Sequence, residues 1–112
     1  MTDTWSTWLA MPAPANFKYD LVGPAGSGVM QVRNRRSGEW IYLGRSGGVL
    51  GRLRSLMPKP HGTGNRDNAQ LRDYVLANYA DLEYRTLVTR SPEEAKALKT
   101  ELAPQEVYRF AP

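Results

Sequence analysis

The sequence contains no cysteine and a single histidine, His61. The lack of cysteine excludes disulfide bonds and thiolate metal sites, and the presence of only one histidine excludes a zinc site built from several histidines. Any metal would therefore be held by carboxylates and water, as Mg²⁺ is. The chain also lacks an apolar run near the roughly 20 residues that cross a bilayer, and its N-terminus lacks the features of a signal peptide. We therefore expect a cytoplasmic protein with no membrane partner.

The composition is that of one soluble domain with a basic centre. With 112 residues, 41% of them hydrophobic and 23% charged, the chain can fill a single core. The formal charge is +4, and arginine outnumbers lysine in the middle of the chain. Because a guanidinium group can bind two phosphate oxygens at once, this cluster favours a polyanionic partner, with a solvated basic face as the alternative. Its members are Arg33, Arg35, Arg36, Arg45, Arg52, Arg54, Lys59 and Arg66.

Residues 1–27 are rich in proline, alanine and glycine and are expected to form an arm on a domain that spans residues 28–112. We expect little regular structure in the arm apart from a short helix near Trp5–Met11. Isolated aromatic residues would hold it against the domain. Trp5 and Trp8 could instead stack on nucleic-acid bases.

The hydrophobic pattern of residues 28–112 predicts an α+β domain with a small three-stranded, largely antiparallel sheet flanked by helices in the order ββααβα. A hairpin is indicated by two alternating segments around a Ser-Gly turn, and the last helix by a capping box that begins at Ser91. The loop of residues 58–68, rich in Pro and Gly, is of the kind that often carries function. The expected strands are 28–34, 40–44 and 82–88, and the expected helices run from Val49 to before Pro58, from a cap at Asp67 or Asn68 to about Tyr79, and from the capping box to about Leu102.

The tripeptide Tyr42-Leu43-Gly44, followed by Arg52 ten residues after Tyr42, resembles the GIY-YIG nuclease superfamily. The resemblance extends from Gly28 to about Leu102, so the chain is similar to a divergent single-domain member. It implies a metal-dependent DNA endonuclease that hydrolyses phosphodiester bonds with Mg²⁺ or Mn²⁺.

The same resemblance assigns roles to three residues. Tyr42 would act as the general base or orient it, Arg52 would neutralise the phosphate oxygens, and Glu101 would bind the metal ion. The sequence also departs from the family pattern. Met30 replaces the tyrosine of the first tripeptide, Leu56 stands where a histidine is often found, and Lys99 aligns with the metal-binding glutamate. His61 could replace the missing histidine only if its loop folds back.

These departures leave two further functions open. One is a catalytically impaired nucleic-acid-binding module on the same scaffold, and the other is a protein-interaction domain. DNA is the expected partner, RNA is an alternative, and a protein partner could supply targeting because the chain has no separate recognition domain. The residues expected to contact nucleic acid are Arg35, Arg36, Arg45, Arg54, Lys59, His61 and Arg66.

Overall fold

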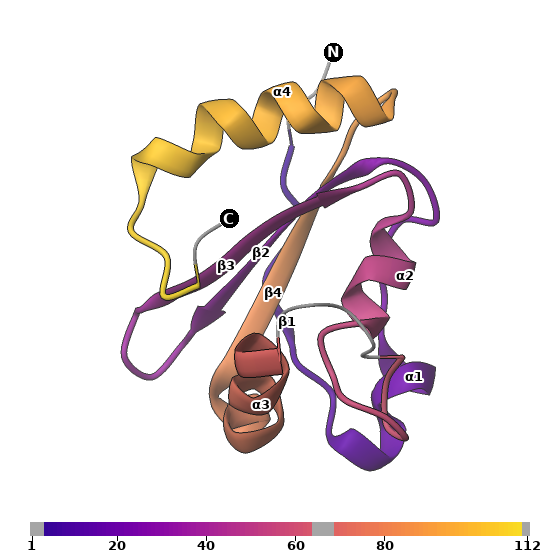
Figure 1. The fold of residues 1–112 in the computed structure, drawn as a ribbon, viewed down its shortest axis with the longest axis vertical. Coiled ribbons are helices and arrows are strands. Elements are labelled where there is room, and N and C mark those ends of the chain that lie inside the picture. Colours follow the sequence, from indigo (N-terminus) through magenta and orange to yellow (C-terminus); the bar gives the residue numbers. More distant parts are fainter. Residues whose placement is uncertain (1–3, 64–68, 111–112) are drawn as a thin grey trace.

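The computed structural model describes residues 4–63 and 69–110, which form an α+β fold (Figure 1). The strands are β1 Leu9–Ala10, β2 Gly28–Asn34, β3 Trp40–Ser46 and β4 Leu82–Val88. The α-helices are α1 Phe17–Asp20, α2 Val49–Arg54, α3 Ala69–Asn78 and α4 Pro92–Leu102, and short 3-10 turns lie at Pro14–Asn16, Tyr79–Asp81 and Ala103–Gln105. None of the helices in the described residues is long and apolar enough to span a membrane.

The sheet is antiparallel and has four strands in the order β1-β4-β2-β3. The expected hairpin of β2 and β3 is confirmed, and β2 is central because it also pairs along its length with β4. The expected count of three strands is wrong, since Leu9–Ala10 pairs with β4 and adds a fourth strand. Strand β3 pairs only with β2 and is an outer strand of the sheet.

The N-terminal segment is extended where a short helix near Trp5–Met11 was expected, so that prediction is wrong. The N–H of Met11 donates to the carbonyl of Leu82 at 3.0 Å, which continues the pairing of β1 with β4. Pro12 also disfavours a helical conformation at Met11. Met11, Phe17 and Leu21 are buried in the main core, so this segment contributes to the same core as residues 28–112.

The tryptophans of the N-terminal segment pack against arginines on the sheet. The guanidinium carbon of Arg33 lies 4.0 Å from the centre of the Trp8 ring, and that of Arg85 lies 4.3 Å from the centre of the Trp5 ring. Such cation–π contacts stabilise exposed sites by roughly 0.5–1 kcal/mol. They confirm the prediction that aromatic residues hold this segment on the domain.

Alternate residues of β2 face two hydrophobic clusters on opposite sides of the sheet, as the two-residue period of a strand requires. Met30 and Val32 are buried in the larger cluster, together with side chains from α1, α2 and α3. Val29 packs with Leu87 of β4 and Ala95 of α4 in the smaller cluster. Figure 1 accordingly shows α4 at the top of the view, with the other three helices below it. Helices α4 and α2 therefore pack on opposite faces of the sheet.

The bounds of β2 and β4 agree with the prediction, whereas β3 continues to Ser46, two residues past Gly44. Helix α2 ends at Arg54, earlier than predicted, and the Ser55 hydroxyl donates to the Arg52 carbonyl at 2.6 Å in the turn that follows. Helix α3 begins at Ala69, and its predicted cap at residue 67 or 68 lies outside the described residues.

The start of α4 is capped largely as the sequence predicts. The Ser91 hydroxyl accepts a hydrogen bond from the N–H of Glu94 at 3.1 Å, which satisfies one free donor of the first turn. The Glu94 carboxylate accepts from the N–H of Arg90 at 2.9 Å, instead of from Ser91 as in a standard capping box. Ala95, the residue after Glu94, is fully buried and packs with Val29 and Leu87 of the sheet.

Candidate functional site

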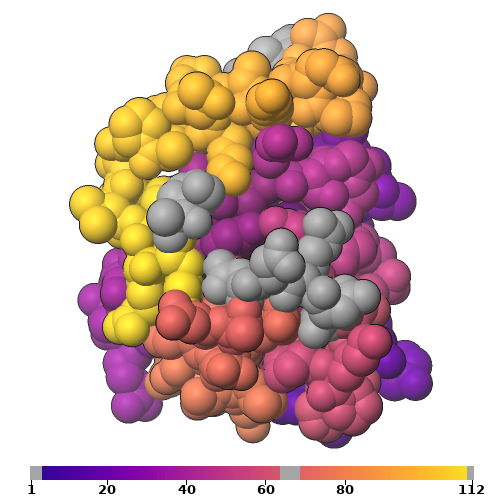
Figure 2. Space-filling model, viewed as in Figure 1, coloured from indigo at the N-terminus to yellow at the C-terminus, as the bar shows by residue number. Residues whose placement is uncertain are grey.

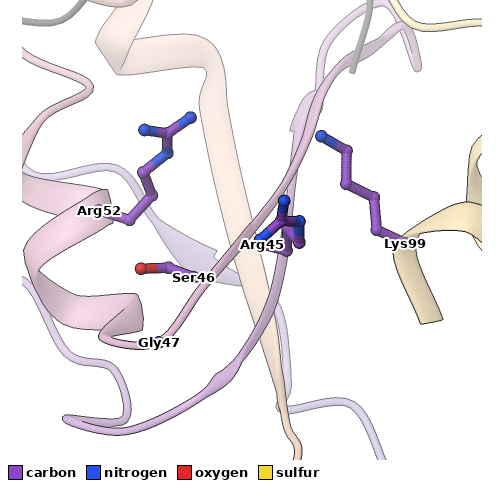
Figure 3. A pocket seen from close by; sticks show the side chains of 5 residues that line it. All are labelled: Arg45, Ser46, Gly47, Arg52 and Lys99. Atoms are coloured by element: carbon purple, nitrogen blue, oxygen red, sulfur yellow. The ribbon is translucent and has the colours of Figure 1, made fainter. Parts of the chain in front are cut away.

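A cavity of about 320 Å³ lies beside the end of the outer strand β3, between α2 and α4. Figure 3 shows side chains approaching from both helices, with Arg45 of β3 between them. In the space-filling view, β3 and α2 reach the surface beside α4 (Figure 2). The residues that line the cavity are Arg45, Ser46, Gly47, Arg52 and Lys99.

Two residues with predicted catalytic roles lie at the cavity: Arg52 lines it, and Tyr42 lies next to Arg52. Arg52 Nη2 donates to the Tyr42 hydroxyl at 2.9 Å, across the ten-residue spacing noted in the sequence. Gly44 makes room for the Tyr42 ring, because a Cβ at Gly44 would lie 2.7 Å from Tyr42 Cε2. The glycine of the tripeptide therefore has a steric role in positioning the tyrosine.

One donor of Arg52 has no acceptor. Its Nε is buried and has no hydrogen-bond partner among the described residues. Leaving a buried polar group without a partner costs about 1–3 kcal/mol, and more for a charged group. In addition, no ion pair of the described residues involves Arg52, so its guanidinium brings an unpaired positive charge to the wall of the cavity.

Lys99 brings a second cation to the cavity from α4. It follows the buried Ala95 by four residues and so shares the helix face that packs on the sheet. Burial lowers the pKa of Lys99, and the nearby charges of Arg45 and Arg52 lower it further. Like charges that face one another in a partly desolvated cavity favour a bound anion.

The carboxylate that would hold a metal ion is not in the lining. Glu101 is exposed and lies two residues after Lys99, so its Cα is rotated by about 200° around α4. The lining offers three cations and one serine. No group of three histidine, aspartate or glutamate side chains suited to a metal occurs in residues 4–63 and 69–110. The residues that line the cavity therefore do not fit Mg²⁺ or Mn²⁺, whose ligands are carboxylate, carbonyl and water oxygens.

The other residues discussed as departures from the family pattern are part of the apolar core or lie apart from the cavity. Met30 is fully buried opposite Gly44 in the β2–β3 register, and it fills core space without supplying a hydroxyl group. Leu56 is only 2% exposed and packs in the same cluster. His61 is half-buried and does not line the cavity, so the described part of its loop does not bring it to Arg52.

The remaining basic residues expected to contact nucleic acid are dispersed. Arg35 and Arg36 lie in the hairpin turn beyond Trp40, where Arg35 donates to the Ala80 carbonyl at 3.2 Å. The five residue-to-residue steps of extended strand from Trp40 to Arg45 span about 17 Å, so this turn is remote from the cavity. Lys59 lines a separate hollow with Lys18, and Arg54 is half-buried at the end of α2. Arg66 lies outside the described residues.

Two residues of α4 were missed by the sequence reasoning. A second hollow of about 370 Å³ adjoins the first, since both are lined by Arg45 and Lys99, and Lys96 and Thr100 line it as well. The signal in the sequence is the three-residue spacing of Lys96 and Lys99, which places both on one side of a helix. The basic surface therefore continues from the cavity along α4.

Comparisons with known proteins give no relative for this chain: no protein-family model, no curated protein and no solved structure matches it. The assignment of a function therefore depends on the geometry and chemistry of the cavity.

Proposed function

We propose that this chain is a nucleic-acid-binding module that holds a phosphate of the backbone in the cavity between α2 and α4. The observation that carries the proposal is the convergence of three cations, Arg45, Arg52 and Lys99, in a lining without a carboxylate. A phosphate would accept charge-assisted hydrogen bonds from these side chains and offset the repulsion around Lys99. These charge-assisted contacts would bind any sequence, because phosphates carry no base information.

A polymeric partner is favoured over a small anion by the adjoining hollow. Lys96 and Thr100 extend the polar surface along α4 beyond the first cavity, and the two hollows share Arg45 and Lys99. A second phosphate or a sugar next to the bound phosphate would have a place there. We take DNA as the partner, and RNA offers the same phosphodiester chemistry.

The second candidate is a DNA endonuclease of the GIY-YIG type. The observation in its favour is the hydrogen bond of 2.9 Å between Arg52 and Tyr42 at the spacing that the resemblance requires. In this candidate Arg52 would stabilise charge on the phosphate, and the Tyr42 hydroxyl would orient the attacking water. It ranks second because an ammonium group, that of Lys99, occupies the cavity where a metal ligand is needed.

Binding can be measured by fluorescence anisotropy with short labelled DNA strands, DNA duplexes and RNA strands. We expect affinity to fall linearly on a log–log plot between about 50 and 200 mM salt, with Arg52→Ala and Lys99→Met each weakening binding about tenfold and reducing the slope by about one. Lys18→Ala is the charge-matched control, since Lys18 is exposed on α1 and does not line the cavity. Binding that ignores salt, or that both cavity variants leave unchanged, contradicts the proposal.

Cleavage of supercoiled plasmid separates the two candidates. The binding module leaves the plasmid intact with Mg²⁺ or Mn²⁺ while still shifting it in a gel. Nicking by the wild-type protein that disappears in both Arg52→Ala and Tyr42→Phe would establish the endonuclease instead.

A further inference from the structure

We infer that the cavity takes the terminal phosphate of a nucleic-acid strand, a phosphomonoester dianion, in preference to an internal phosphodiester. The inference rests on the proposed function and narrows its ligand, because it concerns the kind of phosphate that occupies the cavity.

The charge of the cavity matches a dianion better than a monoanion. Arg45, Arg52 and Lys99 bring three formal positive charges to a space of about 320 Å³. None of the four ion pairs found between described residues includes any of these three side chains. An internal phosphodiester carries one negative charge, whereas a phosphomonoester carries about −1.5 to −2 at neutral pH. The terminal phosphate therefore neutralises more of the local positive charge.

The donors also match a phosphate with three free oxygens. Arg52 enters from α2, Lys99 from α4 and Arg45 from β3, so that N–H groups reach the space from three elements (Figure 3). An internal phosphodiester presents two non-bridging oxygens, since its other two oxygens continue the chain. A phosphomonoester presents three acceptor oxygens. Each of the three cations can then bind an oxygen of its own.

The rest of the strand has a place beside the cavity. The adjoining hollow of about 370 Å³ is lined by Lys96, Thr100 and Ala103 in addition to Arg45 and Lys99. Thr100 and Ala103 present small, partly apolar groups that suit a sugar or base, and Lys96 lies one helical turn from Lys99, where it can meet the next phosphate. A terminal phosphate in the first hollow leaves the nucleotide directed along α4.

The test compares labelled DNA strands that differ only at the 5′ end: a free hydroxyl, a phosphate, or a phosphate blocked as its methyl ester. The methyl ester keeps the phosphorus but has one negative charge and two free oxygens, like an internal linkage. We expect the phosphorylated strand to bind about tenfold more tightly than the other two. That difference should disappear in Arg52→Ala and Lys99→Met, and Lys18→Ala should retain it. Circular dichroism melts confirm that each variant is folded, and Lys99→Gln provides a second variant if Lys99→Met is not.

Two outcomes overturn the inference. If the three strands bind equally but binding stays salt-dependent and sensitive to Arg52→Ala, the proposed function stands and the preference for a strand end is wrong. If a 5′-phosphorylated mononucleotide competes as well as the phosphorylated strand, the ligand is a free nucleotide and not a strand end. Loss of salt dependence together with insensitivity to both cavity variants would instead contradict the proposed function itself.

Discussion

Replacing Gly44 by alanine is expected to disrupt the contact between Tyr42 and Arg52 while leaving both residues in the sequence. The new Cβ would lie 2.7 Å from Tyr42 Cε2 and 3.1 Å from the Tyr42 hydroxyl, whereas ordinary contacts begin at 3.4 Å. The ring must therefore move by about 0.7 Å, and Tyr42 is only 5% exposed in the core. We expect a loss of about 1–3 kcal/mol in the free energy of unfolding, as in other overpacked cores.

The assay is urea denaturation of Gly44→Ala, both alone and in a Tyr42→Ala background. Because the three atoms nearest to the added methyl group all belong to the Tyr42 ring and hydroxyl, the cost of Gly44→Ala should fall by about 1 kcal/mol or more in the second background. Gly51→Ala is the control, because no atom lies within 4 Å of its added Cβ and Gly51 is inside α2. We expect that control to stabilise the protein by up to about 1 kcal/mol.

The refuting result is equal destabilisation by Gly44→Ala in the two backgrounds. It would mean that the ring of Tyr42 is not what the added methyl group meets. The steric role assigned to the glycine of the Tyr42-Leu43-Gly44 tripeptide would then be wrong.

Three further predictions concern stability. Lys99→Met should raise the free energy of unfolding by about 0.5 kcal/mol at neutral pH, because it removes a charge that burial desolvates and that Arg45 and Arg52 repel. Since the fold lowers the pKa of Lys99, its charge destabilises the folded wild type fully below that lowered pKa, and the effect disappears as pH rises towards the ordinary value of about 10.4. The urea midpoints of the wild type and Lys99→Met should therefore differ at neutral pH and converge at alkaline pH. A difference that stays constant with pH contradicts this. Phe17→Ala should cost about 3–5 kcal/mol in thermal unfolding, because Phe17 is fully buried, and a cost below about 1 kcal/mol would show that the N-terminal segment adds little to the core. Tyr84→Phe should lower the free energy of unfolding by about 1 kcal/mol, because the Tyr84 hydroxyl donates to the Val22 carbonyl at 2.9 Å and accepts from the Val22 N–H at 3.0 Å. Tyr19→Phe is the control: this residue is exposed, so the melting temperature should not change.

Elements whose signals are local were predictable from the sequence. The alternation of apolar residues located β2 and β4 at their observed bounds, and the Ser91 cap located the start of α4. Strand β1 was not predictable, because two residues carry no periodic signal and become a strand only by pairing with β4. Extended pairing with a distant partner overrode the local preference for a short helix in that segment.

Part of the site was also predictable. The ten-residue spacing singled out Arg52 and Tyr42, which are hydrogen-bonded in the structure, and the helical period by itself places Lys99 close to the face of Ala95 and Glu101 on another. The cavity itself was not predictable, because its walls come from β3, α2 and α4 and their separation depends on the packing of the whole domain. The sequence also gives no sign that Nε of Arg52 is buried without a partner, because this too depends on the packing of the whole domain.

The distribution of charge in the fold distinguishes this cavity from the rest of the basic surface. Four other arginines of the described residues have carboxylate partners: Arg33 pairs with Glu83, Arg36 with Asp81, Arg90 with Glu94 and Arg109 with Glu39. Arg45, Arg52 and Lys99 have no such pair and converge on one space instead. This arrangement destabilises the free protein, and an anion that binds only the folded state reverses the effect. A ligand at one hundred times its Kd adds about 2.7 kcal/mol to the free energy of unfolding. In the proposed function, the unpaired cations would couple the stability of the fold to occupancy of the cavity, whereas a merely solvated basic face would show no such coupling.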